Sequence, residues 1–231
     1  MIPKKVAIVQ SSYLPWKGYF DIAHDVDEFI FLDEVQYTTR DWRSRNRIKT
    51  AHGTQWLSVP AGSDRKRLIH EVELVDPSWQ ARHWKSIVGA YGRAAFFPLY
   101  RDFFEAIFMG TRWHSLSEFN QTTTRRIANE LLGLPTRFVD SRSYAGSGSK
   151  LELILSLLDR AGATSYLSGP SALGYLDAGR FAERSIELCI KRYEYPVHPQ
   201  LHPPFVHEVS VIDLLFNTGP DAGRFIWGDR P

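Results

Sequence analysis

Two short apolar runs near the N-terminus constrain the fold more than any other feature of the chain. The run Val6–Val9 is rich in β-branched residues and predicts a buried strand, and Phe29–Leu32 predicts a second one. A short helix is expected between them, over about residues 19–24. Strand, helix and strand in this order indicate a βαβ unit with a parallel sheet and a right-handed crossover. We therefore expect an α/β fold with a rossmannoid, mostly parallel sheet.

The rest of the chain adds strands and a helical segment. Alternating or continuous apolar runs predict further strands at residues 56–59, 68–75, 137–139, 165–167 and 186–190. Helical periodicity, a proline entry and a capping box predict helices starting near residue 76, over 98–109, from 115 to about 133, over 151–158 and over 209–216. We expect one α/β domain over residues 1–231, with a helical insert at about 76–134.

Composition excludes several classes of protein. The formal net charge is only +2, which argues against a protein held on nucleic acid or a membrane surface by gross charge. Cys189 is the single cysteine, so an intramolecular disulfide and a cysteine zinc cluster are excluded. The histidine spacings match no metal motif, so no metal is expected. We expect a cytoplasmic protein without membrane insertion, because no signal or membrane-spanning stretch is present.

The loop after the first predicted strand is the first candidate site. Open parallel sheets bind ligands beyond the carboxyl ends of their strands, which is where Gln10 falls. Tyr13 and Trp16 can stack on a sugar or base, and Lys17 can pair with a phosphate or carboxylate. The alternative is a surface loop whose aromatic side chains cover the core.

The end of the second predicted strand offers a carboxylate and an amide. Asp33 can act as a base towards an amine or bind a sugar hydroxyl, with Gln36 and Tyr37 close by in the chain. In the βαβ arrangement these residues lie beside Gln10. The alternative is a strand end at which Asp33 caps a turn.

A basic stretch follows, in which Arg43, Arg45, Arg47 and Lys49 alternate with other residues such as Asn46. In an extended segment the four cations share one side. Arginines on one face suit a diphosphate, because each guanidinium can bind it through two hydrogen bonds. A single nucleic acid strand is the rival ligand, and a solvated charged loop is the alternative without function.

A glycine-containing loop follows the strand predicted at 165–167. Ser168, Gly169 and Ser171 can bring backbone N–H groups close to an anion or an acyl oxygen, and Tyr175 lies just downstream. Such a segment is also an ordinary turn.

Several motifs, in order along the chain, carry a resemblance to a known family. They are Gln10–Asp21, Phe31–Tyr37, Trp42–Lys49, Trp56–Pro60, Tyr166–Ser171 with Tyr175–Leu176, and Ser210–Asn217. Together they resemble the WbqC-like protein family over most of the chain. Membership implies a role in bacterial gene clusters for O-antigen and other surface polysaccharides, or in natural-product biosynthesis. The reaction it implies is transfer of an acyl or aminoacyl group, such as glycine, to an amino sugar.

A second resemblance concerns the fold alone. Residues 10–37 are similar to the start of nucleotidylyltransferase-like α/β enzymes, including pantothenate synthetase, which also place a glutamine and an aromatic residue where Gln36 and Tyr37 stand. Those enzymes carry His-x-Gly-His where this chain has Trp16-Lys17-Gly18-Tyr19. The absence of both histidines argues against ATP-dependent adenylylation.

The sequence as a whole predicts an N-acyl or aminoacyl transferase with a small-molecule or nucleotide-sugar substrate. Asp33, Gln36 and Lys17 are its expected catalytic residues. The expected substrate-binding residues are Gln10, Tyr13, Trp16, Tyr37, Arg45, Asn46, Lys49, Ser168, Gly169, Ser171 and Tyr175. No covalent nucleophile is evident, so we expect direct transfer from an activated acyl donor without a tightly bound cofactor. The alternatives are a non-catalytic binding or scaffold protein and, least favoured by the charge, a nucleic-acid binder. The oligomeric state stays open.

Overall fold

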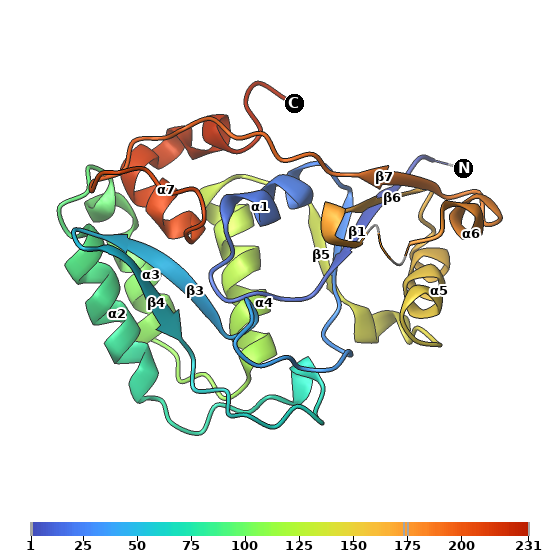
Figure 1. Cartoon of the computed structure of the whole chain (residues 1–231), viewed down its shortest axis with the longest axis horizontal. Helices are drawn as coiled ribbons and strands as arrows, with labels where there is room; N and C mark the ends of the chain where they lie inside the picture. The colour runs from blue at the N-terminus through green and yellow to red at the C-terminus, as the bar shows by residue number, and fades with distance from the viewer. Residues whose placement is uncertain (1, 173, 175, 231) are drawn as a thin grey trace.

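The computed structural model describes residues 2–172, 174 and 176–230, and at its centre lies a five-stranded sheet. Its strands are β1 (Lys5–Val9), β2 (Glu28–Phe31), β5 (Arg137–Asp140), β6 (Ser165–Ser168) and β7 (Glu187–Ile190). Their spatial order is β5-β2-β1-β6-β7, and every pairing is parallel (Figure 1). The expected α/β fold with a rossmannoid parallel sheet is thus confirmed.

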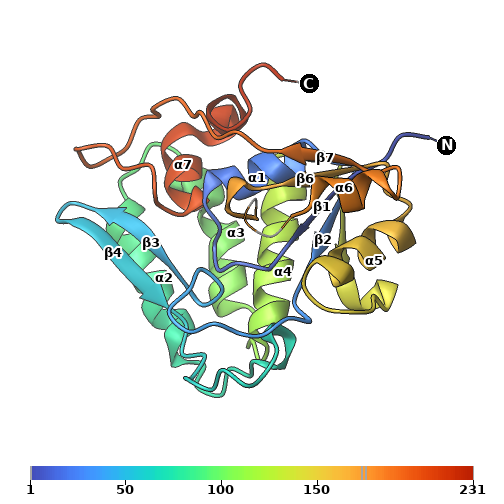
Figure 2. The ribbon, with the colours of Figure 1, turned by 45° about the vertical axis from the view of Figure 1, so that its right-hand side comes forward.

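Helices cover both faces of this sheet, because alternate strand residues point to opposite sides. Val6, Ile8 and Ile30 pack in one apolar cluster with the helices α5 (Leu151–Ala161) and α6 (Ala178–Ala182). Ala7, Phe29 and Phe31 belong to the larger cluster on the other face, together with α1 (Lys17–His24) and α4 (Leu116–Arg126). Figure 2 shows the sheet between these two helical layers.

A long excursion of the chain separates β2 from its neighbour β5. It contains the antiparallel hairpin of β3 (Arg45–Thr50) and β4 (Gly53–Ser58), then the helices α2 (Ser78–Tyr91), α3 (Phe97–Met109) and α4, which ends in the π-helical turn η2 (Ile127–Leu131). Ser115 caps α4 by accepting a hydrogen bond from the Glu118 N–H, as its capping box predicts. The large apolar cluster continues from the sheet through the hairpin and these helices, so the excursion shares its core with the sheet.

The chain returns over α1 after the last strand. Residues 192–210, which we name the crossing segment, contain no helix or strand and lead to α7 (Val211–Thr218) and η5 (Gly219–Phe225) (Figure 1). Polar contacts hold the crossing segment down: Lys17 Nζ donates to the Pro196 carbonyl (3.0 Å), and His198 Nε2 lies 2.9 Å from Asp213 Oδ2. The C-terminal part of the chain therefore covers the start of α1.

One predicted strand is wrong. Residues 68–75 contain the 3₁₀ turn η1 (Ile69–Glu71) and only isolated bridges, from Leu68 to Gln36 and from Glu73 to Ser115. Val72 and Leu74 are buried while their neighbours are exposed, so the alternation in the sequence is real. It reflects an extended segment lying on the core without a partner strand. No helix in the described part of the chain is long and apolar enough to cross a membrane.

Candidate functional site

A cavity of about 330 Å³ opens beyond the carboxyl end of β1. Its lining residues are Ser12, Pro15, Trp16, Tyr19, Trp42, Asn46 and Glu208. The order of the strands reverses between β1 and β6, because the chain first builds outward through β2 and β5 and then crosses to β6. Open parallel sheets bind ligands beside such a reversal, outside the strand ends. The cavity therefore lies close to the expected ligand position for this fold.

Aromatic rings form the walls of the cavity. Trp16 packs edge-on against Tyr193 and Tyr195, with ring centroids 5.1 and 5.7 Å apart, so the crossing segment holds it in place. Gly18 is required beneath it, because a Cβ atom at this position would lie 2.4 Å from the Trp16 ring. Tyr19 donates its hydroxyl to the Gln10 carbonyl (3.0 Å). The rings of Trp16, Tyr19 and the half-exposed Trp42 thus line the same cavity.

Asn46 and Glu208 bring polar groups to the cavity in different ways. The Asn46 side-chain amide donates to the Leu14 carbonyl (2.7 Å) and its Oδ1 accepts from the Arg47 N–H, so this side chain fixes the loop after β1. Glu208 is largely exposed, and its carboxylate lies 3.9 Å from Arg47 Nη2. A surface pair at this distance is weak, so Arg47 does little to hold the Glu208 carboxylate in one position.

The glycine loop after β6 lies next to the cavity through Tyr193. A Cβ atom on Gly169 would stand 3.2 Å from the Tyr193 hydroxyl, and Tyr193 in turn packs on Trp16. Ser168 is buried at the end of β6, and Ser171 belongs to the 3₁₀ turn η4 (Pro170–Ala172). Tyr175 lies outside the described residues.

Asp33 does not face the cavity, contrary to expectation. Its carboxylate is completely buried and accepts hydrogen bonds from Ser11 N (2.9 Å), Gln121 Nε2 (2.9 Å) and the Ser117 hydroxyl. Ser117 and Gln121 stand four residues apart on α4, which packs across the end of β2. Asp33 therefore links the strand ends to α4. Its carboxylate cannot reach a ligand unless these hydrogen bonds break and α4 moves away.

The carboxylate of Asp140 belongs to the same hydrogen-bonded network. The Gln121 amide also donates to Asp140 at the end of β5 (2.8 Å), so one side chain ties two strand ends to α4. Burial alone would raise the pKa of Asp140, but hydrogen bonds from Arg142 and Gln121 lower it to about 2. The carboxyl ends of β2 and β5 are thus closed by a hydrogen-bonded network.

Tyr13 is also enclosed, which corrects its expected role in stacking on a ligand. Its ring is 0% exposed and lies parallel to Phe119 at 5.5 Å, and its hydroxyl shares a 2.7 Å hydrogen bond with His83 Nδ1. Burial lowers the pKa of His83 from 6.5 to about 4, so the pair is neutral at physiological pH. Tyr13 belongs to the core.

The remaining residues expected beside Gln10 turn away from the cavity. Gln36 is exposed and donates to the Arg65 carbonyl (2.8 Å), while Tyr37 is buried and donates to Ser44 Oγ (3.0 Å). The half-buried Gln10 contributes its carbonyl to Tyr19. The structure therefore does not bring the side chains of Gln10, Asp33 and Gln36 together around one ligand.

Lys17 is the most unusual of the expected catalytic residues. It is the first residue of α1, is only 3% exposed, and lies under the crossing segment, 5.1 Å from the Tyr195 ring centroid. Burial lowers its pKa from 10.5 to about 8, against an opposing effect of Asp213. Its ammonium group does not line the cavity, although it adjoins the segment that carries Glu208 there.

The basic stretch divides along β3 and does not form one continuous face. The Arg45 guanidinium lies over the Trp56 ring, 4.2 Å from its centroid, and remains accessible. Lys49 is buried, because the chain leading into α7 covers that end of β3, where Ser210 N donates to the Arg47 carbonyl. The expectation that Lys49 joins Arg45 in holding a phosphate is therefore corrected.

Sequence reasoning did not assign Ser12, Tyr19, Trp42 or Glu208 to the site. Trp42 carried a signal, since it stands beside the basic stretch. Ser12 lies within the loop already singled out, and Tyr19 follows it. No local pattern marks Glu208, which reaches the cavity only because the crossing segment returns over α1.

Comparison with known proteins identifies the family. The model of the WbqC-like protein family matches residues 10–225. An uncharacterized protein of Mycobacterium tuberculosis, Rv1507c, is 41% identical over 229 residues, which cover 96% of this chain and 97% of that protein. No solved structure matches the chain. The chain belongs to the WbqC-like protein family.

Proposed function

We propose that the protein transfers an acyl or aminoacyl group to a small amine, such as an amino sugar, and that the cavity beyond β1 binds this acceptor. The observation that carries the proposal is the combination of aromatic walls with one accessible carboxylate, that of Glu208. Aromatic faces stack on sugar rings and attract cations, and a carboxylate beside them binds an ammonium group. An amine carried on a sugar ring combines both features.

The proposed chemistry is direct transfer. The ammonium group of the acceptor first loses one proton to water, and the resulting unprotonated nitrogen attacks the carbonyl carbon of an activated acyl donor, such as a thioester, and forms the C–N bond. The carbon–sulfur bond breaks, and the leaving thiolate takes up the proton that the nitrogen loses. The loop at Gly169 is the proposed position of the acyl oxygen, because it adjoins the cavity through Tyr193.

Glucosamine and glucose, which differ in the amino group, test the acceptor site. We expect glucosamine to bind at least about tenfold more tightly by isothermal titration calorimetry, because Glu208 favours the ammonium group. Glu208→Gln should abolish this preference, and Trp16→Ala should weaken both sugars. Glu105→Gln is the matched control, since Glu105 also forms a weak ion pair with an arginine (3.4 Å). Equal binding of both sugars to the unaltered protein contradicts the proposal.

A binding protein without catalysis is the second candidate. One observation favours it: Asp33, the carboxylate expected to act as a base, is enclosed by hydrogen bonds. Mass spectrometry of the acceptor after incubation with acyl thioesters, or with glycine and ATP, separates the two. A product heavier by the acyl group supports the transferase, and glucosamine binding without any product supports the binding protein.

A further inference from the structure

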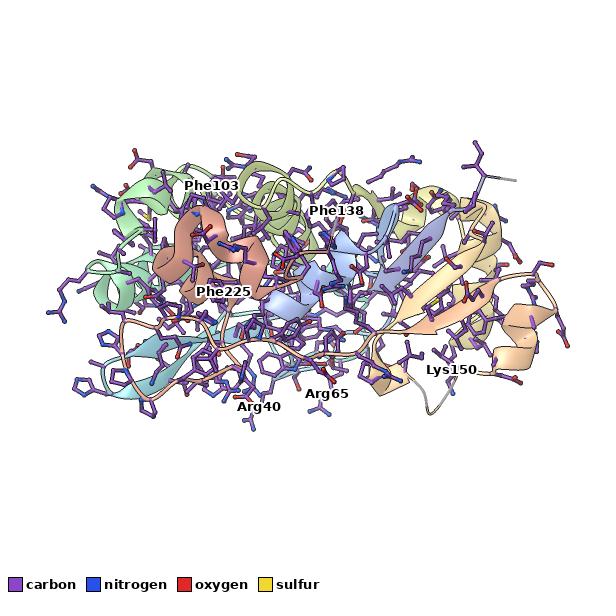
Figure 3. The ribbon with its side chains drawn as sticks, turned by 90° about the horizontal axis from the view of Figure 1, so that it is seen from above. Arg40, Arg65, Phe103, Phe138, Lys150 and Phe225 are labelled. Carbon is purple, nitrogen blue, oxygen red and sulfur yellow. The ribbon has the colours of Figure 1, made fainter. Side chains whose placement is uncertain are left out.

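A second hollow, larger than the acceptor cavity, lies at the base of the hairpin, where Arg45 of β3 pairs with Ser58 of β4. It is a groove of about 650 Å³, and its lining includes Tyr37, Thr39, Arg40, Ser44, Arg45 and Arg65. Guanidinium groups approach it from three separate segments: the loop after β2, strand β3 and the loop after β4. Figure 3 shows Arg40 and Arg65 projecting from the same side of the molecule. We call this hollow the arginine groove.

The positive charges of the arginine groove are not neutralised within the described structure. Arg65 donates only to the Thr39 hydroxyl (3.1 Å), Arg45 lies on Trp56, and Arg40 forms no ion pair among the described residues. Asp41 and Asp64 are next to Arg40 and Arg65 in the chain, and both accept hydrogen bonds from other groups: Asp41 from Arg43 Nη1 (2.9 Å) and its neighbours, and Asp64 from Lys66 N (2.8 Å). Uncompensated guanidinium groups around one hollow favour an anion with several charges.

The backbone and the hydroxyl groups of the groove support this interpretation. Arg40 has a positive φ of 56°, a conformation that is unfavourable for a residue with a side chain and that concentrates at functional sites. Ser44 Oγ accepts a hydrogen bond from Tyr37, which leaves its own proton free to donate. Hydroxyl groups and several neighbouring guanidinium groups can donate hydrogen bonds to the oxygens of a diphosphate.

The arginine groove and the acceptor cavity are neighbours along one segment. Trp42 and Asn46 line the cavity, while Ser44 and Arg45, which lie between them in the chain, line the groove. We propose that the arginine groove binds the diphosphate group of the activated acyl donor, so that its acyl end can reach the amine. This inference rests on the proposed transferase function and names the class of its donor.

Inorganic pyrophosphate is the probe for the arginine groove. We expect it to bind by isothermal titration calorimetry, with affinity about 100-fold lower in the double variant Arg40→Gln/Arg65→Gln, since both substitutions remove charge-assisted hydrogen bonds. The control Arg93→Gln/Arg160→Gln removes the same charge from two exposed arginines outside the groove and should bind within about twofold of the unaltered protein. Equal losses in both variants, or none in either, overturn the proposal.

Further probes identify the source of the diphosphate and separate this proposal from the proposed function. ADP and UDP should compete with pyrophosphate, whereas sulfate at equal concentration should not. Tighter, length-dependent binding of arbitrary oligonucleotides with a steep salt dependence overturns the proposal in favour of nucleic acid. Glucosamine binding to the cavity should be unchanged in Arg40→Gln/Arg65→Gln. Retained glucosamine binding without pyrophosphate binding rejects the groove alone, and the reverse result rejects the acceptor site alone.

Discussion

Replacing Asp33 with alanine is expected to lower the free energy of unfolding by about 3–5 kcal/mol. The carboxylate is fully buried and accepts from the backbone of Ser11, the Ser117 hydroxyl and the Gln121 amide. Alanine leaves these buried donors without their acceptor. The lost contacts join the loop after β1, the end of β2 and α4, so the whole carboxyl edge of the sheet loses an anchor.

The variant Asp33→Asn distinguishes the stability lost with the hydrogen bonds from the stability lost with the volume of the side chain. Asp33→Asn keeps the size of the side chain and one acceptor oxygen for Ser11 N, but it sets an NH₂ group against the donating amide of Gln121. We expect Asp33→Asn to lower the free energy of unfolding by about half as much as Asp33→Ala does. Asp102→Ala is the control, because Asp102 is exposed on α3, and it should change stability by less than about 0.5 kcal/mol.

Urea unfolding followed by circular dichroism measures these differences. The expected order of stability is unaltered protein, Asp102→Ala, Asp33→Asn and then Asp33→Ala. A structural anchor requires this order whether or not the protein is an enzyme. Asp33→Ala with unchanged stability and lost ligand binding would instead return Asp33 to the accessible catalytic role predicted from the sequence.

The sheet could be predicted because its signal is local. Val6–Val9 and Phe29–Leu32 are continuous apolar runs, and a short helix between two such strands leaves few topologies other than a right-handed parallel unit. The same reasoning placed Asp33 correctly at a strand end. The sequence could not show that Ser117 and Gln121, more than eighty residues away, close over it.

The candidate site was predicted less well, since it depends on what covers each side chain. Tyr13 and Trp16 stand three residues apart in one loop, and both look suited to stacking. Phe119 on α4 and His83 on α2 enclose the first, while the second keeps an open face towards the cavity. Lys49 continues the alternation of Arg45 and Arg47, yet the chain before α7 buries it. Residue type indicates what a side chain can bind, and tertiary packing decides whether a ligand can reach it.

Lys17→Met is expected to stabilise the protein near pH 7 by about 1–3 kcal/mol. Burial lowers the pKa of Lys17 from 10.5 to about 8, so folding disfavours its charged form. Below about pH 8 both the folded and the unfolded chain carry the proton, and the full penalty of about 3 kcal/mol is present. Methionine removes the charge and keeps the packing volume, but loses the hydrogen bond to the carbonyl of Pro196, which is an exposed residue.

The sign of the pH dependence follows from proton binding. Between about pH 8 and pH 10.5 the unfolded chain binds more protons at Lys17 than the folded chain does, so the stability contribution of Lys17 improves as the pH rises. The advantage of Lys17→Met should therefore be largest at pH 7, shrink above pH 8 and be nearly gone at pH 10.5. Urea unfolding of both proteins across this range measures it. Lys85→Met, at an exposed position on α2, should show no such trend.

A lysine that lowers stability is expected to persist because the site uses it. Lys17 Nζ donates to the Pro196 carbonyl and does not line the cavity, so we expect it to position the crossing segment. Pro196 and Glu208, which lines the acceptor cavity, belong to the same crossing segment. We therefore expect Lys17→Met to weaken glucosamine binding or product formation while it gains stability. A variant that gains stability with both properties unchanged removes Lys17 from the site, and one that loses stability at pH 7 contradicts the burial penalty itself.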